Sequence, residues 1–307
     1  MLDLRFAQKG TGAFVCTYLK RLKRNASNDI RPAMRAVAER LTLPFKLGLR
    51  RSNGCVPGAG TGSSHDFQDH RPYVPGDDPR HIDWQAYARS GNYTMKLYRE
   101  EVHPLADLVL DASPSMFLDD EKGRRTLEIS WFCAESAHRS GASVRLFSIE
   151  GPDVTLHKAQ TGWEFSDEAR SRGRLSAPDL RCIPWRAASL RVFISDLLYP
   201  GEPGSMMSLL LANRGRSILL VPYSDSEIDP DWLGNTQLID CESEGQRNLR
   251  FDPEDLQAYS ATYLAHFNLW RLEARRHGIP FARVAAGRPF TQALSEEGIP
   301  AAAVELV

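Results

Sequence analysis

The sequence predicts an α/β protein with a doubly wound, mostly parallel sheet, preceded by a smaller irregular module that contains β structure. From residue 104 onward, short apolar runs that are typical of buried strands alternate with longer segments whose apolar residues recur at helical spacing. Strands that alternate with helices favour parallel pairing, with helices on both faces of the sheet. Residues 48–80 lack this alternation and carry many Gly and Pro, which indicates loops or irregular β structure.

We expect three parts along the chain. They are a basic arm and helix over residues 1–44, a Gly/Pro-rich module over residues 45–103, and the sheet domain over residues 104–307. In the first part, Pro32 has the fixed φ that suits the first position of a helix, which would run to about Leu41.

The elements of the sheet domain follow from the same patterns. Apolar runs predict strands at residues 105–111, 143–149, 153–158, 191–196, 217–222 and 280–285. Helical spacing predicts helices near residues 121–140, 202–213, 253–277 and 288–297, and a polar hairpin is expected over residues 236–251. The helix at 253–277 carries an aromatic stripe that includes Tyr259, Tyr263 and Trp270, which indicates core packing rather than a cofactor site.

Size and charge restrict the classes of function. With 307 residues and 42% hydrophobic content, the chain is long enough to bury a sizeable core. A formal net charge of −1 gives no case for nucleic-acid binding. The first 60 residues differ from the rest, because they hold twelve Lys and Arg against three acids. This basic start could be a solvated arm, or it could contact an anionic membrane surface or an acidic partner.

The sequence gives no sign of export or of a membrane span. The longest apolar stretch near the start, residues 13–19, is far shorter than the ~20 residues that a helix needs to cross a bilayer. It also lacks a signal-peptide cleavage pattern, so we expect a cytoplasmic protein. The five cysteines, at positions 16, 55, 133, 182 and 241, form no CxxC pair, which favours reduced and mostly buried thiols.

The most informative polar residues follow two of the predicted strands. Asp111, Ser113 and Ser115 come directly after one apolar run, and Asp196 ends another. Because ligands collect beyond the carboxyl ends of parallel strands, neighbouring strands would bring these side chains to a single cation. Carboxylate and hydroxyl oxygens suit a hard ion such as Mg²⁺ or Mn²⁺. The plainer interpretation, in which Asp111 and the serines only form a turn or cap a helix, stays open.

A dense set of charged and aromatic residues lies upstream, over residues 71–101. Pro75-Gly76 is a turn signal, and Asp77 and Asp78 can bond the backbone amides beyond it. The basic side chains Arg71, Arg80, Arg89 and Lys96 can pair with the acids Asp77, Asp78, Asp83, Glu100 and Glu101. Such a network usually fixes the shape of a loop. We prefer that interpretation to catalysis, since structural ion pairs imitate active sites.

This upstream segment resembles the signature of the bacterial DUF58 family, R-x-Y-x-x-G-D-D-x-R-x-I-D-W-x-x-x-A-R. The matching residues are Arg71-Pro-Tyr-Val-Pro-Gly-Asp-Asp-Pro-Arg80-His-Ile-Asp-Trp84 and then Ala88-Arg89. The resemblance covers roughly residues 45–300 and implies a von Willebrand factor A-like domain directly downstream. Many relatives place Glu-Phe before the motif, where this chain has Asp66-Phe67.

In a domain of that kind, the resemblance implies a metal-ion-dependent adhesion site on the strand-end residues, completed by a Thr from a loop after the third strand. Thr161 is the candidate for this Thr, although the usual Gly-rich setting is missing around it. Family members are often encoded beside MoxR-type AAA+ ATPases and are thought to act with them in protein assembly or maturation. The resemblance therefore implies a protein partner, which would be such an ATPase or its client.

The preferred hypothesis is a non-enzymatic, protein-binding adaptor. Asp111, Ser113 and Ser115 would hold Mg²⁺ or Mn²⁺, and Asp196 would act directly or through water. An open coordination position could then take an Asp or Glu carboxylate of the partner. A metal-free scaffold, in which Asp111 only caps the helix and bonds loop amides, is the alternative that keeps the fold and discards the ion.

A metal-assisted hydrolase is the third hypothesis. The same cation would activate water, and His65, His70 or His81 would supply a base. The sequence contains no Gly-x-Ser-x-Gly, no His-Glu-x-x-His and no Gly-Lys-Ser/Thr motif, which argues against an enzyme.

Overall fold

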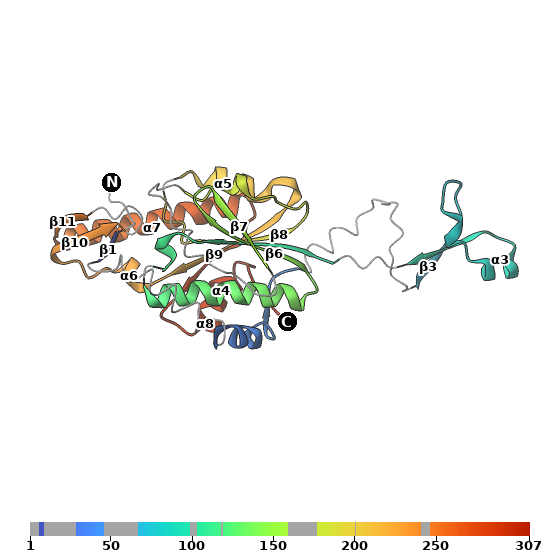
Figure 1. Cartoon of the computed structure of the whole chain (residues 1–307), viewed down its shortest axis with the longest axis horizontal. Coiled ribbons are helices and arrows are strands. Elements are labelled where there is room, and N and C mark those ends of the chain that lie inside the picture. The colour runs from blue at the N-terminus through green and yellow to red at the C-terminus, as the bar shows by residue number, and fades with distance from the viewer. Residues whose placement is uncertain are drawn as a thin grey trace. The chain divides into compact units, whose positions relative to one another are not determined.

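The structure is a computed structural model that describes residues 6–8, 29–45, 67–98, 103–117, 119–158, 177–199, 201–240 and 246–307. The chain divides into two compact units (Figure 1). Residues Met1–Phe45 and Pro104–Val307 form the larger one, which we call the sheet unit. Residues Lys46–His103 form the smaller one, which we call the small unit.

A six-stranded sheet lies at the centre of the sheet unit. Its strands, in spatial order, are β12 (Phe281–Ala285), β9 (Arg216–Tyr223), β8 (Leu190–Ile194), β5 (Leu105–Asp111), β6 (Ser143–Glu150) and β7 (Asp153–His157). Five of these strands run parallel, and only the edge strand β7 is antiparallel to its neighbour. The prediction of an α/β fold with a mostly parallel sheet is therefore confirmed.

Helices cover both faces of this sheet, and the strand residues alternate between the two layers (Figure 1). One face carries α4 (Asp120–Arg139) and α8 (Phe290–Gly298), and the other carries α5 (Pro203–Leu211) and α7 (Pro253–Arg276). On β5, Leu108 and Leu110 pack in the first layer, whereas Val109 packs in the second. This alternation is expected because successive side chains of a strand point to opposite faces.

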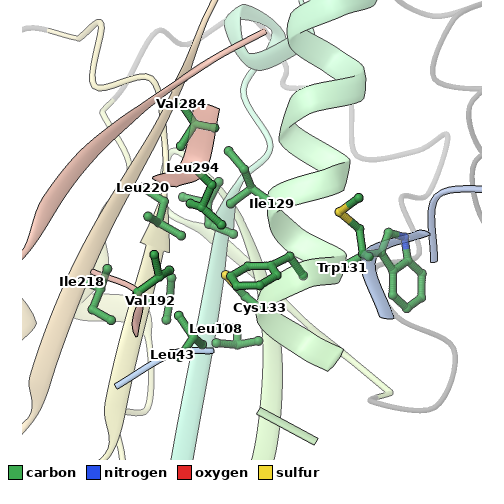
Figure 2. Packing of buried hydrophobic residues seen from close by; sticks show 14 of the residues in the cluster. Leu43, Leu108, Ile129, Trp131, Cys133, Val192, Ile218, Leu220, Val284 and Leu294 are labelled. Atoms are coloured by element: carbon green, nitrogen blue, oxygen red, sulfur yellow. The ribbon is translucent and has the colours of Figure 1, made fainter. Parts of the chain in front are cut away.

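The layer under α4 is a dry apolar core. Figure 2 shows Leu108, Val192 and Leu220 of the sheet packed with Ile129 of α4 and Leu294 of α8. On the opposite face, α7 contributes the predicted aromatic stripe, and its members Tyr259, Tyr263, Phe267 and Trp270 are buried there. Burying a side chain of this size contributes roughly 1.5–3 kcal/mol of hydrophobic free energy.

The N-terminal helix differs from its prediction. Residues 29–37 are helical, so Pro32 lies within the first turn rather than at its first position. Leu41 begins β2 (Leu41–Thr42), which pairs with β13 (Glu305–Leu306) near the other end of the chain. Ile30, Met34 and Ala38 pack into the same apolar layer as α4. These residues therefore help to close the core of the sheet unit.

The remaining described elements are short. A three-stranded antiparallel sheet contains β1 (Phe6–Gln8), β10 (Gly234–Asp240) and β11 (Gln246–Phe251), of which β10 and β11 correspond to the expected hairpin. The helix α6 (Asp225–Ile228) follows β9, and single 3₁₀ turns occupy Pro114–Phe117, Leu180–Cys182 and Ala212–Arg214. Where the chain is described, no helix has both the length and the apolar character that a membrane crossing needs.

The small unit contains a two-stranded antiparallel ribbon, β3 (Phe67–Pro72) and β4 (Thr94–Tyr98), a 3₁₀ turn over Pro79–His81, and the short helix α3 (Trp84–Ser90). Asp83 caps α3 by accepting from the amides of Gln85 and Ala86. Two ion pairs fix the turn that precedes it, namely Arg71–Asp77 at 2.6 Å and Arg80–Asp78 at 2.7 Å. Among the expected pairings, these two and Lys96–Asp83, at 3.7 Å, are present in the structure.

Candidate functional site

The carboxyl ends of β5 and β8 bring the predicted polar residues to one edge of the sheet. The two strands are parallel neighbours, with Leu110 opposite Ile194. Asp111 is the last residue of β5, and Asp196 lies two residues beyond the end of β8. Since β6 pairs with the other side of β5, the strand order changes direction here. Such a switch point is where open α/β sheets bind their ligands.

Asp111 is buried, and only uncharged groups bond to it in the part of the chain that is described. Its Oδ1 accepts from the amide of Ser113 at 3.0 Å, and its Oδ2 accepts from the hydroxyl of Ser195 at 2.7 Å. Burial and then the nearby charge of Asp196 raise the pKa of Asp111 to about 7, although the bonds from the two serines oppose that shift. Among the described residues, no cation bonds Asp111, and its raised pKa means that the ionised carboxylate is disfavoured up to near neutral pH.

Asp196 has a different environment, because the amine of Lys122 pairs with it. Lys122 Nζ donates to Asp196 Oδ2 at 2.8 Å and also to Glu227 Oε1. The second oxygen, Asp196 Oδ1, accepts from the amide of Leu198 at 3.1 Å. Burial opposes the charge on Lys122, but the charges of Asp196 and Glu227 outweigh it and raise the pKa of the amine. Burial also raises the pKa of Glu227.

Two helix starts deliver this buried cluster to the edge of the sheet. Asp119 caps α4 by accepting from the amide of Lys122 at 2.6 Å, which places the lysine in the first turn. Glu227 belongs to the capping box of α6, where its Oε2 accepts from the amide of Ser224 at 3.0 Å. Its other oxygen remains free for Lys122. The capping groups of α4 and α6 thus fix both ends of the ion pair.

The backbone after β8 is strained at the site. Leu197 is fully buried and has a φ of 57°, a left-handed conformation that bulky residues rarely adopt. Its amide donates to the hydroxyl of Ser195 at 3.1 Å, and its carbonyl lies 2.8 Å from Nε2 of His266 on α7. Such strain costs about 1–3 kcal/mol and persists where the surroundings hold it. Here it turns the chain so that Ser195 and Asp196 both lie at the edge where β5 and β8 end.

The oxygen atoms fit a hard cation at one half of the site. The hydroxyls of Ser113 and Ser115 are 3.0 Å apart, which is also about the separation of two adjacent oxygens that each lie ~2.1 Å from an octahedral Mg²⁺. Within the described ranges, no three His, Cys, Asp or Glu side chains gather so that they could hold a metal ion by themselves. A cation at this edge would therefore depend on the two hydroxyls as well as on Asp111.

The structure brings together four of the five predicted site residues, namely Asp111, Ser113, Ser115 and Asp196, at the edge where β5 and β8 end. The fifth, Thr161, lies outside the described residues. Sequence reasoning missed Lys122, Glu227 and Ser195. A signal for the lysine existed, since it lies at positions i−4 and i−7 from Thr126 and Ile129 on the buried face of α4.

Of the three histidines that we considered as bases, one lies outside the described residues and two belong to the small unit. His65 lies outside the described residues, and His70 belongs to the small unit, where its Nε2 lies 2.8 Å from Asp83 Oδ2. His81 also belongs to the small unit. The imidazole at the edge of the sheet is that of His266, whose pKa is lowered by burial and which bonds the carbonyl of Leu197. The contacts of His266 are those of a packed structural residue.

Comparison with known proteins supports the resemblance in the sequence. Residues 69–169 match the model of a family described as "Protein of unknown function DUF58". No curated protein matches the chain. Among solved structures, the conserved hypothetical protein BatB from Bacteroides thetaiotaomicron aligns at a TM-score of 0.32 and 12% identity, over 65% of this chain and 98% of that one. A similarity of this size does not define the fold.

Proposed function

We propose that this chain, in which residues 69–169 carry the DUF58 match, is a non-enzymatic protein-binding adaptor whose sheet unit is a von Willebrand factor A-like domain. In this proposal, the edge formed by β5 and β8 holds Mg²⁺ or Mn²⁺, and the ion takes a carboxylate of a protein partner. The partner would be a MoxR-type AAA+ ATPase or its client, in the cytoplasm.

The order and direction of the strands support the assignment of the domain. The first strand of the sheet, β5, lies at its centre, the next two follow on one side, and the last three follow on the other. Only the edge strand β7 is antiparallel, and helices cover both faces. This arrangement supports a doubly wound sheet of the kind that the sequence resemblance implies.

The observation that carries the proposed site is the uncompensated charge of Asp111. A buried carboxylate that has only neutral donors, close to a second acid, is costly unless a cation approaches it. Asp111 and the hydroxyls of Ser113 and Ser115 would hold the ion. When bound, the ion would supply positive charge and an open position for a partner's carboxylate.

The second acid would have a different part in the same site. Asp196 is already paired with the ammonium group of Lys122, whereas the described donors to Asp111 are neutral, so Asp196 would reach the ion through water rather than directly. Thr161, which lies outside the described residues, stays a candidate for the remaining ligand. The chain's own residues therefore provide one direct carboxylate and two hydroxyls.

Titration calorimetry with Mn²⁺ and Mg²⁺ tests this site. We expect wild type to bind one ion, and Asp111→Asn to weaken binding at least tenfold, because one charge at contact distance is removed. Asp225→Asn is the matched control, since Asp225 is exposed at the nearby start of α6. Heats that are absent from wild type would refute the metal site. Equal affinity in wild type and Asp111→Asn would refute the role of Asp111.

A metal-free scaffold is the second candidate, and one observation favours it. Lys122 is a cation that the fold itself supplies, and it already bonds Asp196 and Glu227. If this amine is the sole cation of the edge, calorimetry should show no heat, and partner capture should persist in EDTA. Capture that EDTA abolishes and Mn²⁺ restores would exclude the scaffold.

The identity of the partner rests on the resemblance to DUF58 alone. The test is co-purification of the full chain with a MoxR-type ATPase, with and without ATP and with and without EDTA. We expect that capture requires a divalent ion on the adaptor and that it also depends on whether ATP is present. Absence of the ATPase under every condition would leave the adaptor with another partner.

A further inference from the structure

Lys122 is the least expected group at the strand ends, because a fully buried amine needs strong compensation. Its exposed fraction is 0%, and its two partners, Asp196 and Glu227, are also buried. Breaking such a pair by removing one partner is strongly destabilising, whereas the intact pair adds little to stability. Because the buried ion pair adds little to stability, we expect another role for Lys122. The formal charges around it point to a role in setting the charge of the metal site.

The formal charges at the edge nearly balance when a divalent ion is counted. Two buried carboxylates, those of Asp196 and Glu227, bond the buried amine of Lys122, and a third, that of Asp111, lies close enough for the charge of Asp196 to act on it. With every group ionised, the cluster has a charge of −2, which a divalent cation would bring to zero. Without Lys122 the cluster would have a charge of −3, and the loaded site would stay negative.

We propose that Lys122 is a positioning and charge-setting residue of the metal site, an inference that rests on the proposed function. Its amine holds Asp196 away from direct ligation, so that the ion binds at Asp111, Ser113 and Ser115. Its positive charge also keeps the loaded site from becoming negative. The loaded site therefore stays able to accept a partner's carboxylate. Lys122 thus lowers the affinity for the metal and raises the affinity of the loaded site for an acidic ligand.

The nearby exposed acids do not disturb this balance. Glu121 and Asp225 lie around Gly287 on the same side of the sheet, but both are exposed to water, which screens their charges. A charge in the buried cluster acts through a lower dielectric and is felt more strongly. Changing Lys122 or Glu227 therefore changes the charge of the ion's surroundings, while the exposed acids remain as a constant background.

A set of charge variants tests the inference. Glu227→Gln has a cluster charge of −1, wild type has −2, Lys122→Met has −3, and the double variant Lys122→Met/Glu227→Gln returns to −2. Calorimetry measures the affinity for Mn²⁺ alone. The water-proton relaxivity of bound Mn²⁺, titrated with acetate, measures how readily a carboxylate displaces water from the ion.

The two measurements should move in opposite directions. Lys122→Met should bind Mn²⁺ at least tenfold more tightly and respond less to acetate, because the loaded site becomes negative. Glu227→Gln should bind Mn²⁺ at least tenfold more weakly and respond more to acetate. The double variant should return to the acetate response of wild type, because its cluster charge is again −2. It should still bind Mn²⁺ more tightly than wild type, because Asp196 is then free to ligate the ion directly. Asp225→Asn should change neither measurement.

Two outcomes overturn the inference, and they differ from failure of the proposed function. If Mn²⁺ affinity and acetate response change in the same direction in the single variants, or if the acetate response of the double variant differs from that of wild type as much as that of Lys122→Met does, Lys122 does not set the charge. If wild type binds no Mn²⁺, the metal site itself fails, and this inference fails with it. Circular dichroism reports folding, and should Lys122→Met not fold, the remaining two variants decide.

Discussion

The two ends of β5 hold one buried aspartate each, and their environments are opposite. At the amino-terminal end, Asp107 accepts from Arg145 at 2.9 Å, from Arg186 at 2.8 Å and from the hydroxyl of Ser189 at 3.0 Å. Burial alone would raise the pKa of Asp107, but the bonds to the two arginines lower it. At the other end, the donors to Asp111 are all neutral in the described part of the chain, and its pKa is raised.

The difference separates a structural charge from a functional one. Arg145 lies on β6, Arg186 lies in the segment before β8, and Ser189 immediately precedes β8, so Asp107 joins three neighbouring segments. Its charge is more than compensated, and nothing further is needed there. The charge of Asp111 is not compensated, which is the condition under which a buried acid becomes available to a ligand. Burial is the same at both ends, and the partners decide the role.

The largest expected effect comes from the amino-terminal end. Asp107→Ala should lower the free energy of unfolding by about 3–5 kcal/mol, because the substitution removes the shared partner of two arginines. Urea denaturation measures the change. Asp153→Ala on the edge strand β7 is the control, since Asp153 is exposed and should shift the midpoint little. If both variants lose a similar amount of unfolding free energy, Asp107 does not have the structural role that we assign to it.

A smaller effect of opposite sign is expected at the other end. A raised acid pKa means that the folded state binds the proton more tightly than the unfolded state, so wild type in EDTA should lose stability as the pH rises from about 4 to about 7. Above that range the loss levels off, at roughly 2–4 kcal/mol. Asp111→Asn should flatten this slope, to which Glu227 also contributes because its pKa is raised, and should be the more stable protein at pH 8.

Urea midpoints collected from pH 4 to pH 8 in EDTA provide the measurement. A wild-type curve that rises toward neutral pH with the same slope in Asp111→Asn would mean that Asp111 is compensated after all. Repeating the series with Mn²⁺ sharpens the test, because an ion that binds the carboxylate should restore the lost stability by mass action.

The smallest effect concerns the cap that delivers Lys122. Asp119→Ala removes the acceptor of the Lys122 amide and should cost about 1 kcal/mol of stability. Glu121→Ala removes a charge from the same helical turn but leaves the cap in place, so it should cost less. Thermal unfolding of the two variants ranks them, and a larger loss in Glu121→Ala would show that charge matters more there than the cap.

Local patterns in the sequence predict the layers of this protein well. Apolar runs located β5, β8 and β9, and helical spacing located α4 and α7, because a buried element repeats its apolar residues at the period of its own geometry. The site hypothesis assumed that β5 and β8 are neighbours, and the structure pairs them. The predicted bounds of the helix at 29–37 were less accurate, since a proline is tolerated throughout the first turn of a helix and does not mark its first residue.

The long-range charge pairings of the sheet unit were beyond prediction. Lys122 meets Asp196 and Glu227 across 74 and 105 residues of sequence, and Arg186 meets Asp107 across 79. No local pattern encodes such distances. Asp107 even occupies the middle of an apolar run, where it reads as an interruption of the strand rather than as its anchor. The sequence identified four acidic and hydroxyl residues of the candidate site because they follow strands. It did not identify Lys122, the cation that pairs with one of them.

Glu227 gives this rim of the protein a mechanical property. Its carboxylate accepts hydrogen bonds from the amine of Lys122 on α4 and from the amide of Ser224. Its backbone carbonyl accepts a hydrogen bond from the hydroxyl of Tyr259 on α7 at 3.0 Å. The helix layers above and below the sheet are thereby tied to a single residue. A pull exerted on the strand ends would load both layers at once, so the sheet unit should transmit force as one stiff body rather than let one layer slide past the other.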